Sequence, residues 1–289
     1  MPDSGSRGRF QYISISRSLS RSFDAMATVR QAAVAGRFYP DDPRKLRDLV
    51  DELLAAAGSG DDPGPPPKAL IAPHAGFVYS GTVAASAYAG LASARSTIGR
   101  VGMLGPAHRV PVRGLAASAA SAFATPLGPV SIDRAAIEQV AELDQVEVAE
   151  EAHLFEHCLE VQLPFLQQVL ESFSLIPLLV GEATPSAVAE VLERLWGGEE
   201  TLIVISSDLS HFHDYETARR IDANTSDAIL ALTGTHLGLE MACGARAIRG
   251  LLTQARRHGL AARQVDLRNS GDTTGPKDQV VGYGSYAFA

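Results

Sequence analysis

Two histidines stand directly after apolar runs, where their side chains could share one ion. His74 follows the run Leu70–Ala72 and a proline, and His108 follows Val101–Leu104 and a Gly-Pro pair. Short apolar runs that end at Gly or Pro are typical of buried strands, and α/β proteins place ligand-binding groups at the carboxyl ends of such strands. The pattern predicts that His74 and His108 converge on one metal ion. The alternative is that both rings only hydrogen-bond backbone groups.

A third strand end carries further polar side chains. The apolar run that begins at Thr201 predicts a buried strand, and Asp208 and His211 follow it. A carboxylate three residues before a histidine can orient the imidazole. The alternative interpretation is an Asx turn followed by a helix cap. Four further histidines are expected at the surface: His153, His213, His236 and His258.

The rest of the chain alternates between predicted helices and strands. The helices are predicted at residues 43–57, 82–91, 133–142, 187–196 and 215–232 and from Cys243 onward, the strands at 70–72, 175–180 and 280–288 and from Thr201 onward, and a hairpin at 123–133. Such alternation predicts an α/β fold with helices on both faces of a mostly parallel sheet.

Composition narrows the class of protein. The chain has 289 residues, 46% of them hydrophobic, and a net charge of −8, which suits a globular protein and argues against a nucleic-acid surface. No apolar run approaches the roughly 20 residues that span a bilayer, so no membrane partner is expected. The two cysteines, Cys158 and Cys243, make no disulfide framework. We expect a cytoplasmic, reducing compartment.

The first 25 residues differ from the rest of the chain. Residues 1–25 are rich in Ser and Arg and have almost no acidic residue and no apolar period. We expect a disordered extension that carries no chemistry. The composition fits a transit peptide, and it also fits a misassigned start codon with the ordered chain beginning at Met26, which is the interpretation we prefer.

A set of short motifs resembles those of the Memo family, whose bacterial and archaeal members are often called AmmeMemoRadiSam system protein B. The motifs occur in order and with matching spacing at Ala72–Tyr79, Leu104–His108, Glu156–His157, Val180–Gly181, Ser206–His211, Cys243–Gly244 and Ser270–Gly275. The resemblance implies that residues 26–289 form a single three-layer α/β/α domain, similar to the class III extradiol dioxygenases.

The resemblance also implies a metal site, because His74, His108 and Cys243 match the positions that hold a metal in the family. A thiolate is softer than the carboxylate of iron(II) dioxygenases and favours copper or zinc. We expect iron(II) or copper, with zinc as the weaker alternative. Cys243 stands near a predicted helix start, where the helix dipole and Arg246 would lower the pKa of its thiol. Its alternative role is that of a small buried apolar residue, which is the role we expect for Cys158.

Four further residues are candidates for catalysis by resemblance. Asp208 and His211 match positions that line the same pocket, and Tyr79 matches a tyrosine near the metal. His157 matches a position suited to a general acid or base, and its alternative role is to bond a backbone group near a helix start.

The functions that follow are expectations of three kinds. The first is a non-haem metal-dependent oxidoreductase, similar to a dioxygenase, that acts on an unknown small substrate. The second is a non-catalytic protein that keeps the pocket and binds a small molecule or a peptide. The third and weakest is a zinc hydrolase. The family name also implies a pathway shared with radical-SAM and AMMECR-type proteins.

Overall fold

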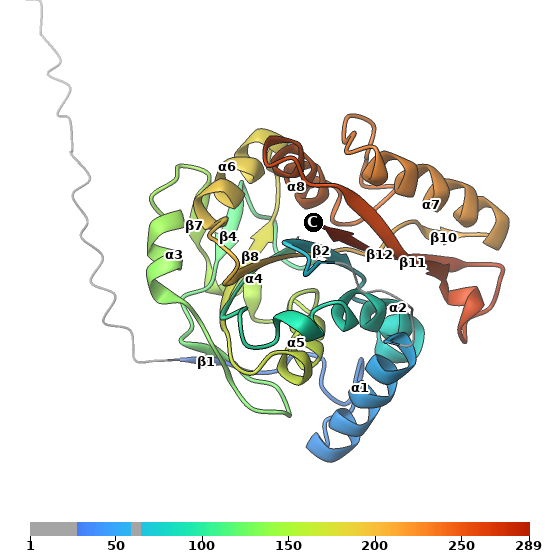
Figure 1. The fold of residues 1–289 in the computed structure, drawn as a ribbon, viewed down its shortest axis with the longest axis horizontal. Helices are drawn as coiled ribbons and strands as arrows, with labels where there is room; N and C mark the ends of the chain where they lie inside the picture. The colour runs from blue at the N-terminus through green and yellow to red at the C-terminus, as the bar shows by residue number, and fades with distance from the viewer. Residues whose placement is uncertain (1–27, 59–64) are drawn as a thin grey trace, which may run out of the picture.

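Four parallel strands form the centre of the main sheet (Figure 1). The computed structural model describes residues 28–58 and 65–289, so the predicted extension at residues 1–25 lies outside the described residues. In spatial order the four strands are β2 (Ala69–Ala72), β9 (Thr201–Ser206), β3 (Arg100–Pro106) and β8 (Ser174–Val180). Nearly all of their residues are buried, as in a sheet covered on both faces. The predicted α/β fold is confirmed.

Antiparallel pairings extend this parallel centre on both sides. β12 (Val280–Phe288) runs antiparallel to β2 and pairs in turn with β10 (His211–His213) and β11 (Ala262–Asn269). At the other side, β4 (Leu115–Ala117) runs antiparallel to β8 and parallel to β7 (Val146–Val148). The sheet is therefore parallel in its centre and mixed toward its edges.

The register of the central strands brings their carboxyl ends to one edge of the sheet. Ala72 pairs with Ser206, and Leu104 pairs with Ile205. Pro106, at the end of β3, pairs with Val180, at the end of β8. The loops that follow these strands therefore meet above the same edge.

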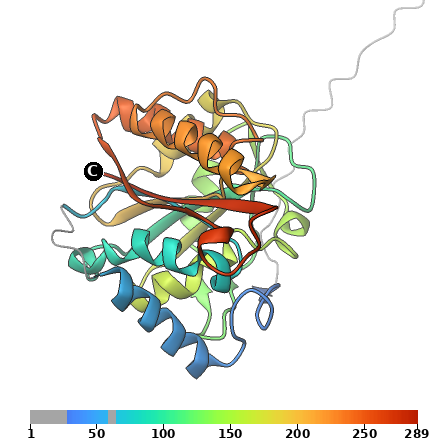
Figure 2. The same cartoon turned by 90° about the vertical axis from the view of Figure 1, so that its right-hand side faces the viewer.

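Helices cover both faces of the sheet, as the view along the sheet shows (Figure 2). One face carries α1 (Pro43–Ala57), α2 (Phe77–Ala89) and α5 (Leu163–Val169), which pack on one another. The opposite face carries α3 (Arg134–Val140), α6 (Pro185–Leu195), α7 (Tyr215–Leu230) and α8 (Ala245–Arg257). The predicted three layers are present. No helix in the described ranges is long and apolar enough to cross a membrane.

Several predicted helix starts are confirmed by side-chain caps. Asp133 accepts a hydrogen bond from the backbone N of Ala136, and α1 begins at Pro43 after its cap Asp42. The predicted helix at residues 82–91 begins earlier than expected, because Gly76 already caps α2 and its carbonyl accepts from Ser80.

The short elements lie outside the main sheet and helices. The predicted hairpin at residues 123–133 is confirmed as the antiparallel pair β5 (Ala122–Phe123) and β6 (Val130–Ser131), which β1 (Val29–Arg30) extends to a small sheet. The remaining short helices are α4 (Glu150–His153), η1 (Ala92–Ala94), η2 (Glu160–Gln162) and η3 (Ser270–Asp272).

His153, at the end of α4, corrects one of the sequence predictions. Its side chain is buried and not solvated, and its Nε2 lies 3.0 Å from the carbonyl oxygen of Ala116. Burial lowers the pKa of His153 to about 4, so the ring is neutral near pH 7. A neutral imidazole with a backbone partner can replace an apolar side chain in a core, which no local sequence pattern reveals.

Candidate metal centre

Three histidines converge above the carboxyl ends of the central strands. His74 follows β2 and His108 follows β3, as predicted, and their ring centroids are 5.3 Å apart. His157 joins them from the turn before η2, with its ring stacked on His108 at 5.0 Å. One candidate ligand atom from each of the three histidines lies within 4.8 Å of those of the other two. The structure thus brings together the two histidines predicted as ligands and His157, which was predicted as a general acid or base.

A hydrogen-bond chain fixes the tautomer of His74. The Ser206 hydroxyl donates its one proton to the carbonyl oxygen of Cys158 at 2.6 Å and accepts from the amide nitrogen of Gln162 at 2.8 Å. The Nδ1 of His74 lies 2.9 Å from the same hydroxyl oxygen, so Nδ1 must carry the proton and donate. This leaves the Nε2 lone pair, which faces the Cys243 sulfur at 3.4 Å, available to a cation.

The surroundings of His74 also keep its ring uncharged. The side chain is almost fully buried, and burial lowers the pKa of His74 to about 4 against the opposing charge of Asp208. The neighbouring rings of His157 and His108 lower it further. A neutral imidazole is the form that binds metals.

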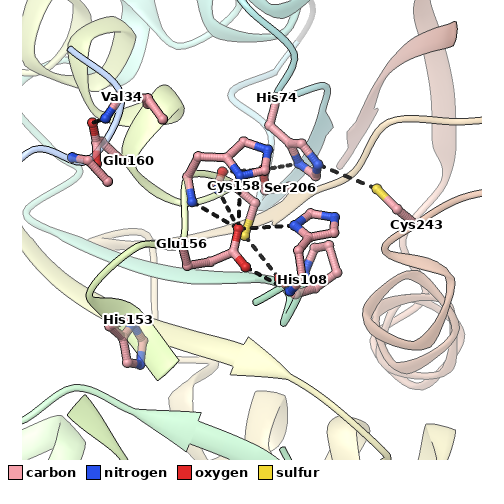
Figure 3. Close-up of polar contacts among 12 residues, drawn as sticks. Val34, His74, His108, His153, Glu156, Cys158, Glu160, Ser206 and Cys243 are labelled. Carbon is pink, nitrogen blue, oxygen red and sulfur yellow. Dashed lines mark hydrogen bonds and ion pairs between the residues drawn. The ribbon is translucent and has the colours of Figure 1, made fainter. Parts of the chain in front are cut away.

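Glu156 holds the second histidine in the same manner (Figure 3). Its Oε2 accepts from the backbone N of His108 at 2.7 Å, and its Oε1 lies 3.0 Å from His108 Nδ1. The same Oε1 accepts from the backbone N of His157 and of Cys158. A carboxylate that accepts a hydrogen bond from Nδ1 orients the ring and leaves the Nε2 lone pair for a metal, which is the usual support of a metal-bound histidine.

The buried Glu156 carboxyl stays ionised. Burial acts to raise its pKa, but hydrogen bonds from His108 and His157 outweigh burial and hold the pKa well below the ordinary range. The Nδ1 of His157 lies 3.1 Å from Glu156 Oε1 and has no partner in hydrogen-bond geometry among the described residues. His157 is therefore less firmly oriented than His108.

Cys243 lies beside this cluster, directly before α8. Its Sγ is 3.4 Å from the Nε2 of His74 and 3.6 Å from the carbonyl oxygen of Asp208. The predicted low pKa of the Cys243 thiol is wrong when only the protein's own groups act on the thiol. Burial and the nearby charge of Asp208 raise the pKa of the thiol to about 12, and this outweighs the hydrogen bonds to the sulfur that would lower it. A cation at the site would reverse this balance, because a coordinating thiol loses its proton.

The donor set fits a metal ion. His74 and His108 each direct a free Nε2 away from a fixed Nδ1 partner, and the Cys243 sulfur faces the Nε2 of His74. Imidazole and thiolate are ligands that iron, copper and zinc accept. One triad, His74–His108–His157, has candidate ligand atoms that all lie within 4.8 Å of one another. Cys243, with its sulfur 3.4 Å from the Nε2 of His74, is a further donor beside it.

Asp208 is buried in the site but does not orient His211. Its Oδ1 accepts from the backbone N of His74 at 2.7 Å, whereas the Nδ1 of His211 lies 2.8 Å from the carbonyl oxygen of Leu209. No Asp208–His211 hydrogen bond forms in the described part of the chain. The reason is that the chain turns after β9, with Leu209 bonded to Gly282 and His211 starting β10. Asp208 supports the loop of His74 instead.

The remaining predicted residues lie around this centre. Tyr79 stands on the first turn of α2 and is 42% exposed, and within the described ranges it makes no hydrogen bond or ring contact with the three histidines. Cys158 is buried in the core, as expected. Sequence reasoning gave no role to Glu156, Ser206 or Gln162. The one usable signal was the Glu156–His157 dipeptide, since a carboxylate beside a candidate ligand suits a supporting role.

Comparison with known proteins gives one consistent family. The Memo-like protein family matches residues 30–287. A MEMO1 family protein of Aquifex aeolicus is 36% identical over 269 residues, which cover 88% of this chain and 97% of the relative. A MEMO1 family protein of Saccharolobus solfataricus is 33% identical over 277 residues, with coverage of 88% and 97%.

A likeness to a solved structure is weaker. The crystal structure of an uncharacterized protein from Escherichia coli K12 superposes with a TM-score of 0.49 at 13% sequence identity, and the match covers 75% of this chain and 98% of that one.

Proposed function

The chain belongs to the Memo-like protein family, and from its histidine cluster we propose that it binds one metal ion through His74, His108 and Cys243. The observation that carries this proposal is the pair of Nδ1 atoms held by Ser206 and Glu156, which leaves both Nε2 atoms free. A hydrogen-bond partner on Nδ1 that orients the ring is the usual support of a metal-bound histidine. The Cys243 sulfur at 3.4 Å from His74 Nε2 supplies the third donor.

His157 is the rival for the third position. A ring nitrogen of His157 lies within 4.8 Å of ring nitrogens of His74 and His108, close enough for the three to share one ion. Cys243 is the softer donor. We assign His157 to proton transfer beside the ion, as a general acid or base, because its ring stacks on His108 without a firm Nδ1 partner. Asp208, His211 and Tyr79 remain candidates for catalysis around the same pocket.

Iron(II) or copper is the ion we propose, with zinc as the weaker alternative. Two imidazoles and one thiolate leave coordination positions open, and a redox-active ion bound there would supply the electron transfer of an oxidoreductase such as an oxygenase. The chain's own groups hold the His74 imidazole neutral, and Asp208 keeps the His74 loop in place. The substrate is a small molecule that reaches the ion from the cavity that His108 and Cys243 line.

A non-catalytic binding protein is the second candidate. Two aromatic side chains next to site residues are strongly exposed: Phe155, beside Glu156, at 72%, and Phe212, beside His211, at 70%. Exposed aromatic residues favour contact with a ligand or a peptide. Oxygen uptake under a panel of small substrates separates the two candidates, since only the oxidoreductase consumes oxygen.

Calorimetric titration with iron(II) and with copper tests the ligand set. His74→Ala, His108→Ala and Cys243→Ser should each weaken binding by more than the about 10–100-fold typical of a lost supporting hydrogen bond. His157→Ala should keep the ion, and His236→Ala, an exposed histidine, is the matched control. Elemental analysis of anaerobically purified protein identifies the ion. Unchanged affinity in the first three variants would overturn the proposal, and loss of the ion in His157→Ala would replace Cys243 by His157.

A further inference from the structure

A cavity of about 250 Å³ opens beside the proposed metal ligands. His108 and Cys243 line one part of it, and the ends of β3 and β8 and the start of α8 enclose the rest. Most of the other lining side chains are apolar, including Ala107, Val180 and Leu239. A molecule held here would touch both the ion and an apolar wall.

Arg246 is the one lining residue of this cavity with a permanent charge. It stands on the first turn of α8 and is partly buried. Its guanidinium makes no hydrogen bond or ion pair with the residues that the structure describes. By contrast, the buried Arg30 pairs with Glu160, and the partly buried Arg100 pairs with Asp133. Arg249, on the same helix as Arg246, is also partly buried and its guanidinium makes no hydrogen bond or ion pair with the described residues, but it lies outside the cavity lining.

An unpaired guanidinium in an apolar wall favours an anionic ligand. Arginine binds a carboxylate through two parallel hydrogen bonds, and partial burial strengthens them. A single arginine with no second cation in the lining matches a monoanion better than a phosphate dianion. The volume of the cavity equals that of about eight water molecules in the liquid, which limits the ligand to a small molecule.

We propose that this cavity binds a small organic carboxylate, with the carboxylate on Arg246 and the apolar body against Val180 and Leu239. The opposite end of the molecule then lies toward His108 and Cys243. This inference names the substrate class of the proposed metal site and rests on that proposal for its catalytic meaning. Arg246 is a specificity-determining residue in this arrangement, since it selects for a negative charge.

Ligand-observed NMR titrations with benzoate and butyrate test the proposal, and benzamide and butyramide are their neutral counterparts. Wild type should bind at least one carboxylate more tightly than its amide. Arg246→Gln should weaken carboxylate binding about tenfold or more, because it removes a charged hydrogen bond, and should leave amide binding unchanged. Arg246→Lys should retain part of the affinity. Arg249→Gln, on the same helix and outside the cavity lining, is the matched control.

The metal content of every variant separates this inference from the metal proposal. Arg246→Gln protein that retains its metal and loses the carboxylate supports the inference. Equal carboxylate affinity in wild type and Arg246→Gln overturns it and leaves the metal proposal intact. Failure of both carboxylates to bind wild type, or amides that bind as tightly, also overturns it. If wild type holds no metal, the metal proposal fails, and the carboxylate titration still gives its own result.

Discussion

Two glutamates four residues apart perform opposite tasks. Both Glu156 and Glu160 are almost fully buried. Glu156 accepts from the backbone and ring of His108 and from the backbone of His157, so its charge orients the groups of the site. Glu160 pairs with Arg30 and faces away from the histidines, toward the N-terminal segment (Figure 3). The difference lies in the partner, which is a ring that can bind a metal in one case and a permanent cation in the other.

The partners of Glu160 tie the start of the described chain to the core. Its Oε2 accepts from the backbone N of Ala33 at 2.7 Å, and its Oε1 accepts from the backbone N of Val34 at 3.0 Å and from the Tyr39 hydroxyl. Arg30 is itself buried, and its charge has this carboxylate as its counter-ion. Glu160 therefore serves the fold.

Arg30 also links the two regions. Besides Glu160, its guanidinium donates to the backbone carbonyls of His153 and Glu156. One buried side chain thus holds the backbone that leads into His157. Rigid support of this kind is what keeps the donor groups of a site in place.

The largest effect is expected at Glu160, whose partners Arg30, Ala33, Val34 and Tyr39 form, together with the Arg30-bonded His153, what we call the fold region. Glu160→Gln leaves the Arg30 charge buried without a counter-ion, and we expect the free energy of unfolding to fall by about 3–5 kcal/mol. Urea denaturation followed by circular dichroism measures this. Glu171→Gln, an exposed glutamate, should change stability by less than about 0.5 kcal/mol. Equal stability of Glu160→Gln and wild type would show that the ion pair is dispensable.

The next largest effect is expected at Glu156, which with His74, His108 and His157 forms what we call the site region. Glu156→Gln removes the charge that holds His108 and His157, and we expect metal affinity to fall about 10–100-fold. Calorimetric titration with iron(II) measures it. Glu150→Gln is the matched control, because Glu150 also accepts several hydrogen bonds, from Ser118, Ala119 and Ala120, but touches none of the three histidines. A loss of affinity as large in Glu150→Gln would mean that the effect is general loosening.

The fold and two of the site histidines could be predicted because they depend on local pattern. An apolar run that ends in proline, or in Gly-Pro, predicts a strand end, and parallel strands bring such ends together, so His74 and His108 were found. Cys243 came from the resemblance to the family, and its role as a ligand stays a prediction.

The supporting residues could not be predicted because their partners are far away in the chain. Ser206 meets His74 across 132 positions, and Glu160 meets Arg30 across 130. The spacing of Asp208 and His211 suggested that the carboxylate orients the imidazole. This spacing was misleading, because after the turn that follows β9 the Asp208 carboxylate accepts from the backbone N of His74 instead.

The smallest expected effect compares one histidine from each region. His153 in the fold and His74 in the site both have a pKa lowered from 6.5 to about 4, with burial as the largest cause. Between pH 4 and 6.5 each histidine binds a proton in the unfolded chain but not in the folded chain. Each histidine's contribution to stability is therefore complete above pH 6.5 and declines as the pH falls toward 4. At pH 5.5 each should cost about 1.4 kcal/mol relative to pH 7.5.

Urea denaturation of His153→Gln and His74→Gln at these two pH values, with a chelator present, tests this comparison. Each variant should lose about that much of the difference in stability between pH 7.5 and pH 5.5, since glutamine does not titrate. The two should differ in metal affinity, because the Nε2 of His153 lies on the Ala116 carbonyl while that of His74 faces the Cys243 sulfur. His153→Gln should bind iron(II) like wild type, and His74→Gln should not. If His153→Gln loses the metal as well, the site depends on the packing of the fold region and the division between the two regions fails.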